Sequence, residues 1–63
     1  MPDLSIIIVN RNTRRLISEA LRSIYSSIMK LSFEIIVVDN GSIDGSCEMV
    51  RKDFPKVMLI ENK

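Results

Sequence analysis

The 63-residue sequence has no histidine, no tryptophan and only one cysteine, Cys47. Without a histidine base, a Ser-His-Asp hydrolytic triad is excluded. One cysteine without histidine does not make a zinc-ligand set. A single thiol also excludes an internal disulfide framework, which favours a reducing compartment and therefore a cytoplasmic location.

An excess of charge and long hydrophobic segments are also missing. Nine basic and eight acidic residues leave a net charge of +1, so no nucleic-acid partner is expected. The longest apolar runs, near residues 4–9 and 35–38, are far shorter than the roughly 20 residues that cross a bilayer. Neither the glycine-rich turn of dinucleotide-binding folds nor a P-loop is present.

The sequence does contain dense apolar blocks separated by turn-forming residues. Short runs rich in isoleucine and valine are typical of strands buried in parallel sheets, and apolar residues at a period near 3.6 indicate helices. We predict strands at residues 4–9, 33–38 and 57–60, with helices at 14 to about 29 and at 43 or 44 to 53.

The helix ends and buried faces follow from the same patterns. Asn12 or Thr13 is a suitable N-cap for the first helix and Ser42 for the second, and Pro55 ends the second helix. Each helix has one predicted buried stripe: Leu16, Ile17, Ala20, Leu21, Ile24 and Ile28 in the first, and Ile43, Cys47, Val50 and Phe54 in the second.

The order β-α-β-α-β predicts an α/β fold with a parallel three-stranded sheet and both helices on one face. Both faces of each strand are apolar: Leu4, Ile6 and Ile8 alternate with Ile7 and Val9, Phe33, Ile35 and Val37 with Ile36 and Val38, and Val57 and Leu59 with Met58 and Ile60. The face opposite the helices is therefore expected to be bare. Large apolar patches rarely stay in water. We therefore expect a homo-oligomer, a two-fold dimer, that covers this open sheet face or pairs the edges of the first strand.

Ligands of open α/β sheets bind outside the carboxyl ends of the strands. Two polar loops follow the first two strands there, at residues 9–13 and 39–46. Asp39 ends the second strand, where its carboxylate can bind a ring N–H or a ribose hydroxyl, or can instead accept amide hydrogen bonds within its own turn. Sequence position leaves both roles open.

The basic residues at the start of the first helix have two interpretations. Arg11, Arg14 and Arg15 oppose the helix dipole, so an anion such as a diphosphate would explain them. Arginines on a solvated helix face are equally ordinary. Cys47 lies on the apolar stripe of the second helix, which favours an inert buried thiol.

Three segments resemble family 2 glycosyltransferases. Residues 5–12 read S-I-I-I-V-N-R-N, residues 33–46 read F-E-I-I-V-V-D-N-G-S-I-D-G-S, and residues 54–62 read F-P-K-V-M-L-I-E-N. They are most similar to the rhamnosyltransferase-like branch, whose strands end in V-N-Y-N and V-D-N-G-S-x-D-G-S. The resemblance implies that residues 1–63 are a single partial domain. It also implies the strand order 3-2-1 and the amino-terminal, nucleotide-binding half of the Rossmann-like GT-A fold.

By this resemblance, Val9, Asn10, Arg11 and Asp39 would bind the nucleotide of a nucleoside-diphosphate sugar, with Asp39 on the pyrimidine ring. Arg11 stands where the family usually has a tyrosine that stacks on the base; a guanidinium can also stack on a planar ring or reach a phosphate. The family's Asp-x-Asp metal site and catalytic base are expected beyond residue 63. We therefore assign no catalytic residue, metal ligand or cofactor to this chain, and expect Mg²⁺ or Mn²⁺ only in a full-length parent enzyme.

Two functions of different classes remain. One is the donor-binding portion of a sugar transferase, inactive as an isolated chain. The other is a non-catalytic α/β module that binds nucleotide or assembles with itself.

Overall fold

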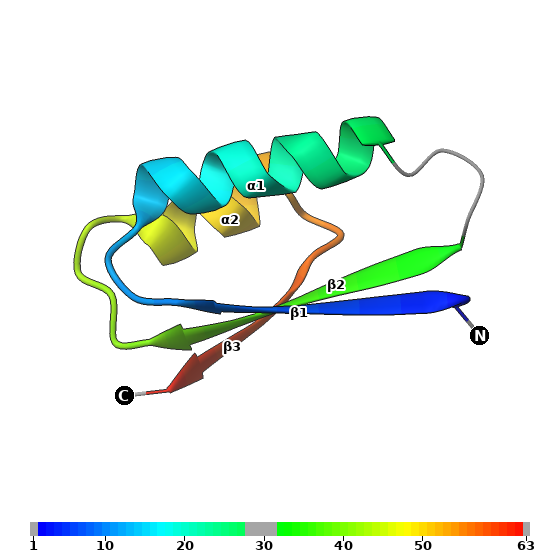
Figure 1. Ribbon diagram of the computed structural model, residues 1–63. Helices are drawn as coiled ribbons and strands as arrows, with labels where there is room; N and C mark the ends of the chain where they lie inside the picture. Colours follow the sequence, from blue (N-terminus) through cyan, green and yellow to red (C-terminus); the bar gives the residue numbers. More distant parts are fainter. Residues whose placement is uncertain (1, 28–31, 63) are drawn as a thin grey trace.

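The computed structural model describes residues 2–27 and 32–62 and contains the five predicted elements in the predicted order (Figure 1). Strands β1 (Leu4–Asn10), β2 (Phe33–Asn40) and β3 (Met58–Asn62) alternate with helices α1 (Arg14–Ser27) and α2 (Ser46–Asp53). Both strand pairs are parallel. The predicted α/β class and three-stranded parallel sheet are therefore confirmed.

The strand order is β1-β2-β3, so β2 lies between the other two strands. The register places Asn10 of β1 opposite Asp39 of β2, and Asp39 opposite Glu61 of β3. Because the strands are parallel, their polar carboxyl ends meet at one edge of the sheet. We call this edge the carboxyl edge.

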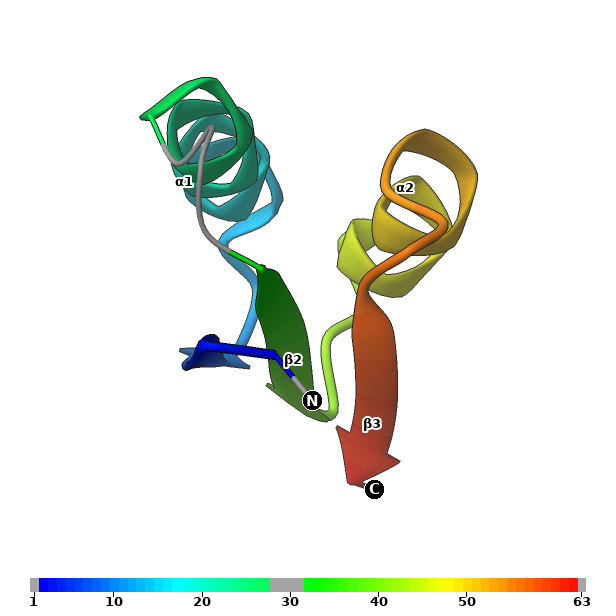
Figure 2. The ribbon, with the colours of Figure 1, turned by 90° about the vertical axis from the view of Figure 1, so that its right-hand side faces the viewer.

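Both helices cover the same face of the sheet, α1 on the β1 side and α2 on the β3 side (Figures 1 and 2). Side chains of β2 alternate between the two faces, and Ile35 and Val37 point toward the helices. They form a buried core with residues from both helices and from the segment before β3: Ile17, Leu21, Met49, Val50, Phe54 and Val57.

The other face carries no helix in the described part of the chain (Figure 2). Ile7 and Val9 of β1 are each 66% exposed there, and Met58 and Ile60 of β3 are also exposed. This confirms the predicted division of the strands into a covered face and an open face.

Helix α2 begins later than predicted, at Ser46 rather than at residue 43 or 44. Gly45 precedes it with a φ of 86°, a left-handed conformation that interrupts helical geometry. Ile43 therefore lies in the loop and is 92% exposed, so its predicted burial is wrong. Ser42 is not the cap residue either, because Gly45 occupies that position.

The buried stripe of α1 is narrower than predicted. Ile17 and Leu21 are buried and Ile24 is partly buried, whereas Leu16 is 64% exposed and Ala20 is also exposed. A helix that covers a small sheet from the side of an edge strand buries only the residues that face the sheet directly. The predicted helix end near residue 29, and Ile28, lie outside the described residues.

Thr13 takes the predicted N-cap position of α1, where its carbonyl oxygen accepts a hydrogen bond from the N–H of Ile17 at 2.8 Å. Within residues 2–27 and 32–62, no helix has the length and hydropathy needed to cross a membrane.

Candidate functional site

Asn10 and Asp39 form a buried polar pair at the carboxyl edge. Each is 2% exposed, and the Asn10 amide nitrogen donates a hydrogen bond of 2.7 Å to Oδ1 of Asp39. Strand alternation turns both side chains toward the helices, in line with the apolar core residues that precede them. The two apolar strands thus end in polar side chains that bind each other.

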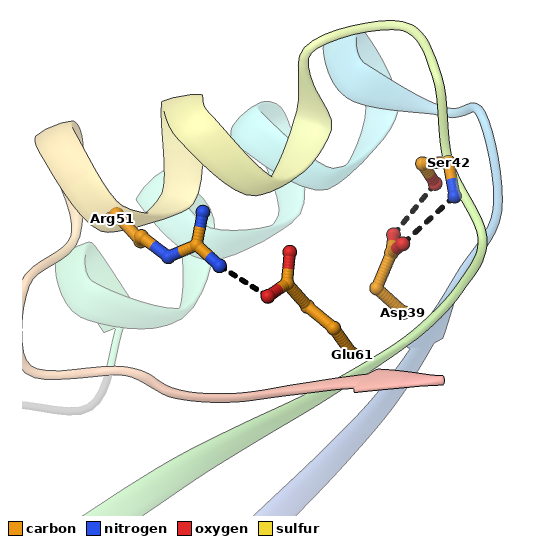
Figure 3. A network of polar contacts seen from close by, with 4 residues as sticks. All are labelled: Asp39, Ser42, Arg51 and Glu61. Atoms are coloured by element: carbon orange, nitrogen blue, oxygen red, sulfur yellow. Dashed lines mark hydrogen bonds and ion pairs between the residues drawn. The ribbon is translucent and has the colours of Figure 1, made fainter. Parts of the chain in front are cut away.

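The Asp39 carboxylate also organises the turn that follows β2 (Figure 3). Its Oδ1 accepts a hydrogen bond from the Ser42 hydroxyl at 2.6 Å, and its Oδ2 accepts one from the Ser42 backbone N–H at 2.8 Å. The turn-bonding role that the sequence left open is therefore present.

These contacts set the protonation state of Asp39. Burial alone would raise the pKa of this carboxyl group, but the hydrogen bonds from Ser42 and Asn10 outweigh burial and lower the pKa to about 2. Asp39 is therefore a carboxylate at neutral pH.

Asn12 and Ser42 join the loop after β1 to the loop after β2. The Asn12 backbone N–H donates to the Ser42 hydroxyl at 2.8 Å, and the Ile43 backbone N–H donates to Oδ1 of Asn12 at 2.8 Å. Asn12 adopts a φ of 51°, a left-handed conformation that asparagine tolerates better than most residues. We call residues 10–13 and 39–46 the loop pair. Both joining residues were predicted only as caps.

Asp44 joins the starts of the two helices. Its Oδ2 accepts a hydrogen bond from the N–H of Arg14, the first residue of α1, at 3.0 Å, and its Oδ1 accepts one from the N–H of Ser46, the first residue of α2, at 3.0 Å. The Ser46 hydroxyl is the main cause of the lowered pKa of Asp44, and the Arg14 and Ser46 amides lower it further. A carboxylate is favoured at both positive helix ends.

The three arginines near α1 have different surroundings. Arg14 packs over Gly45. A Cβ atom added to Gly45 would lie 3.2 Å from Nη1 of Arg14. Arg15 forms an exposed ion pair with Glu19 at 3.4 Å. Arg11 is exposed just after the end of β1.

An open hollow of about 590 Å³ lies between the helices, and Arg14 and Arg15 are among the residues that line it. Three carboxylate side chains line the same hollow: Glu19, Asp44 and Asp53. These carboxylates oppose the positive charge, so the hollow does not support the diphosphate interpretation of Arg14 and Arg15.

The four predicted nucleotide-binding residues do not point to one side of the sheet. Asn10 and Asp39 lie together on the covered face, whereas the Val9 side chain lies on the open face. Of the four, only Arg11 combines an exposed side chain with a position in the loop pair.

Cys47 of α2 is buried next to the Asp39 carboxylate. Burial, followed by the neighbouring Glu61 and Asp39 carboxylates, raises the pKa of its thiol to about 12. The thiol is therefore protonated at neutral pH and is a poor nucleophile, which agrees with the expected inert role. On the outer side of this region, Arg51 of α2 forms an ion pair with Glu61 of β3 (Figure 3).

Of three comparisons with known proteins, the one with protein-family models gives a match. Residues 5–63 match the family model for glycosyl transferase family 2. No curated protein and no solved structure gives a significant match. The match covers almost the whole chain, including β1, β2 and the loop pair, and the chain therefore belongs to glycosyl transferase family 2.

Proposed function

We propose that this chain is the donor-nucleotide-binding portion of a family 2 glycosyltransferase of the rhamnosyltransferase-like branch. In this proposal it forms the amino-terminal half of a Rossmann-like GT-A domain and binds a nucleoside-diphosphate sugar. The observation that carries the proposal is the Asn10–Asp39–Ser42 network at the carboxyl edge, within a segment that matches the family. Open α/β sheets bind ligands at this edge.

The hydrogen bonds of Asp39 leave room for one further donor. Its Oδ1 accepts two hydrogen bonds and its Oδ2 accepts one from Ser42, whereas the two oxygens of a carboxylate together offer about four acceptor positions. A ring N–H of a pyrimidine base could occupy the remaining acceptor position in place of the Cys47 thiol, which also hydrogen-bonds to this carboxylate. Since Asp39 is almost fully buried, the loop after β2 must shift for the base to reach it.

Arg11 and Val9 have different roles in the proposal. The exposed Arg11 guanidinium stacks on the base or binds a phosphate oxygen, in place of the tyrosine usual in the family. The Val9 side chain lies on the open face, so Val9 contributes backbone atoms to the nucleotide site.

In the proposed parent enzyme, a divalent cation would be held by residues outside the loop pair. The described residues contain no group of three or more histidine, cysteine or acidic side chains able to hold a metal ion. The carboxylates nearest the proposed site, those of Asp39 and Asp44, accept hydrogen bonds from N–H and O–H groups, so these residues do not fit a metal site. The cytoplasmic location stays a prediction.

The isolated 63-residue chain should transfer no sugar. Catalysis needs an acceptor-activating base and a group that stabilises the departing diphosphate, each placed within hydrogen-bond reach. We expect the purified chain, incubated with Mg²⁺, a uridine or thymidine diphosphate sugar and water as acceptor, to release diphosphate no faster than a buffer blank. Release above the blank that follows the protein through purification would contradict this prediction.

Nucleotide binding should depend on Arg11 and not on Arg15. In NMR titrations of isotope-labelled chain with uridine or thymidine diphosphate, we expect shifts of the loop-pair amides and a Kd on the order of 1 mM. Replacing Arg11 with alanine should weaken binding about fivefold, the effect of losing an exposed cation–π or ionic contact of about 1 kcal/mol.

Arg15→Ala is the matched control, because Arg15 is also exposed but pairs with Glu19 on α1. Its Kd should equal that of the unaltered chain. If both alanine variants bind equally well, Arg11 is not part of the site. If no nucleotide shifts the loop-pair amides, the self-assembling module without a nucleotide ligand is the better description.

A further inference from the structure

The segment between the two glycines of the chain contacts the Asp39 carboxylate. Gly41 and Gly45 have φ values of 82° and 86°, in the left-handed region that favours glycine. Residues 42–44, which we call the strap, thus have a conformationally permissive residue at each end. Ser42, the first residue of the strap, donates to Asp39 from both its hydroxyl and its backbone N–H (Figure 3).

The strap is held in place by contacts that involve side chains. The Asn12 backbone N–H donates to the Ser42 hydroxyl, and the Ile43 backbone N–H donates to Oδ1 of Asn12, both at 2.8 Å. At the other end, the Asp44 carboxylate accepts from the Arg14 N–H at 3.0 Å. In the described part of the chain, no backbone–backbone hydrogen bond outside the helices and strands involves the strap.

The sheet that precedes the strap is held more firmly. Strand β2 is hydrogen-bonded to a neighbouring strand on each side, and its Ile35 and Val37 side chains are buried in the core. Segments with few buried apolar contacts open at a lower free-energy cost than core strands. We therefore expect the strap to detach from Asp39 while the sheet stays paired.

We infer that the strap controls access to the nucleotide site, so that only a chain with its strap open admits the base of a nucleoside diphosphate. The ligand in this inference rests on the proposed function. In the closed arrangement described here, Asp39 is 2% exposed and offers no surface to a base. The apparent Kd is then the Kd of the open form divided by the fraction of chains that are open.

This mechanism predicts that the loss of a contact strengthens binding. Ser42→Ala removes the hydroxyl that donates to Asp39 and accepts from the Asn12 N–H, so it destabilises the closed form. Loss of a hydrogen bond to a charged group should raise the open fraction about tenfold. The Kd for uridine or thymidine diphosphate in the NMR titration should therefore fall about tenfold. If Ser42 only supported the shape of the site, binding would weaken instead.

Three further variants separate opening of the strap from damage to the site. Ser42→Thr keeps the hydroxyl and should keep the Kd of the unaltered chain. Ser26→Ala is the matched control, because the Ser26 hydroxyl donates one hydrogen bond of 2.9 Å to the Arg22 carbonyl within α1; its Kd should not change. Asn12→Gly keeps the left-handed φ, removes the acceptor of the Ile43 N–H and leaves the contacts of Asp39 in place. It should lower the Kd about fivefold, and it decides the question if Ser42→Ala does not fold.

Amide hydrogen exchange of the chain without ligand tests the opening itself. The backbone N–H groups of Asn12, Ser42 and Ile43 all donate to side-chain atoms in the contacts of the strap. They should exchange through one common opening, at least about tenfold faster than the N–H of Val37 in β2, which requires loss of the sheet. The strap exposes little surface when it opens, so its exchange should depend only weakly on urea.

Two results would overturn control by the strap. One is exchange of the three N–H groups no faster than that of Val37, because the strap would then open only with the whole fold, whether or not nucleotide binds. The other is binding by folded Ser42→Ala and Asn12→Gly that is no tighter than binding by the unaltered chain. Circular dichroism establishes that each variant is folded. Fast exchange in the strap without nucleotide binding by any of these chains would instead overturn the proposed function, and with it the ligand that the strap admits.

Discussion

Replacing Asp39 with asparagine is expected to lower the free energy of unfolding by about 2 kcal/mol, a large fraction of the stability of so small a domain. The pKa of Asp39 falls from 3.8 to about 2 in the folded chain. A difference of that size corresponds to about 2 kcal/mol of stabilisation of the charged form. The asparagine side chain has only one acceptor oxygen. Its NH₂ group would face N–H and O–H groups that donate to the carboxylate, and two donors cannot hydrogen-bond to each other.

Urea unfolding followed by circular dichroism measures this loss. Asp53→Asn is the control, because Asp53 is an exposed carboxylate at the end of α2, and its midpoint should change little. The burial of Asp39 and its three hydrogen bonds are the reason for this expected loss of stability. Equal midpoints for Asp39→Asn and the unaltered chain would show that the network adds nothing to stability.

The same carboxylate should make the fold sensitive to acid. Because the folded-state pKa is below the unfolded-state pKa, the unfolded chain takes up a proton first as the pH falls. The stabilisation is complete above pH 3.8 and is lost progressively as the pH falls toward about 2. Asp44, whose pKa is also lowered, acts in the same direction. Between pH 5 and 2 the urea midpoint of unfolding should fall less in Asp39→Asn than in the unaltered chain.

Leu21→Ala should destabilise the chain even more, by about 3 kcal/mol. Leu21 of α1 is fully buried against β2, next to Ile17 and Val37. Its truncation removes apolar contacts and leaves a cavity in a core that has few other side chains to fill it. We expect a substantial unfolded population of this variant at 25 °C.

Leu16→Ala provides the comparison, because it makes the same change on the same helix at a residue that is 64% exposed. Its unfolding free energy should stay within about 0.5 kcal/mol of the original, since alanine is also a good helix former. Equal urea midpoints for the two alanine variants would mean that α1 does not pack on the sheet through Leu21.

The fold was predictable because the local signals agree with one another. The uninterrupted apolar run at residues 35–38 is short, rich in β-branched residues and followed by turn formers, which together favour a strand with both faces covered. Pro55 marks the end of α2, and Phe54 before it is buried. The start of α2 was not predictable in the same way, because the local sequence does not show that Gly45 adopts a left-handed φ of 86° and so delays the helix to Ser46.

The candidate site was predictable in position but not in detail. Asn10 and Asp39 each follow an apolar strand, so their arrival at the same edge follows from parallel pairing. The burial of their side chains does not follow from parallel pairing, because burial depends on which face of the sheet the helices cover at each strand end. The joining contacts of Asn12 and Ser42 connect residues 30 positions apart, and no local pattern indicates such a pair.

The position of Asp44 has a consequence for the order of folding. Helix α1 precedes Asp44 in the chain, yet the N–H of its first residue, Arg14, is bound by the Asp44 carboxylate. A chain that has formed only β1 and α1 therefore leaves that N–H without its partner until β2 has paired and its loop is in place. Since closing long loops is slow in parallel sheets, the start of α1 should gain protection from hydrogen exchange late, together with α2.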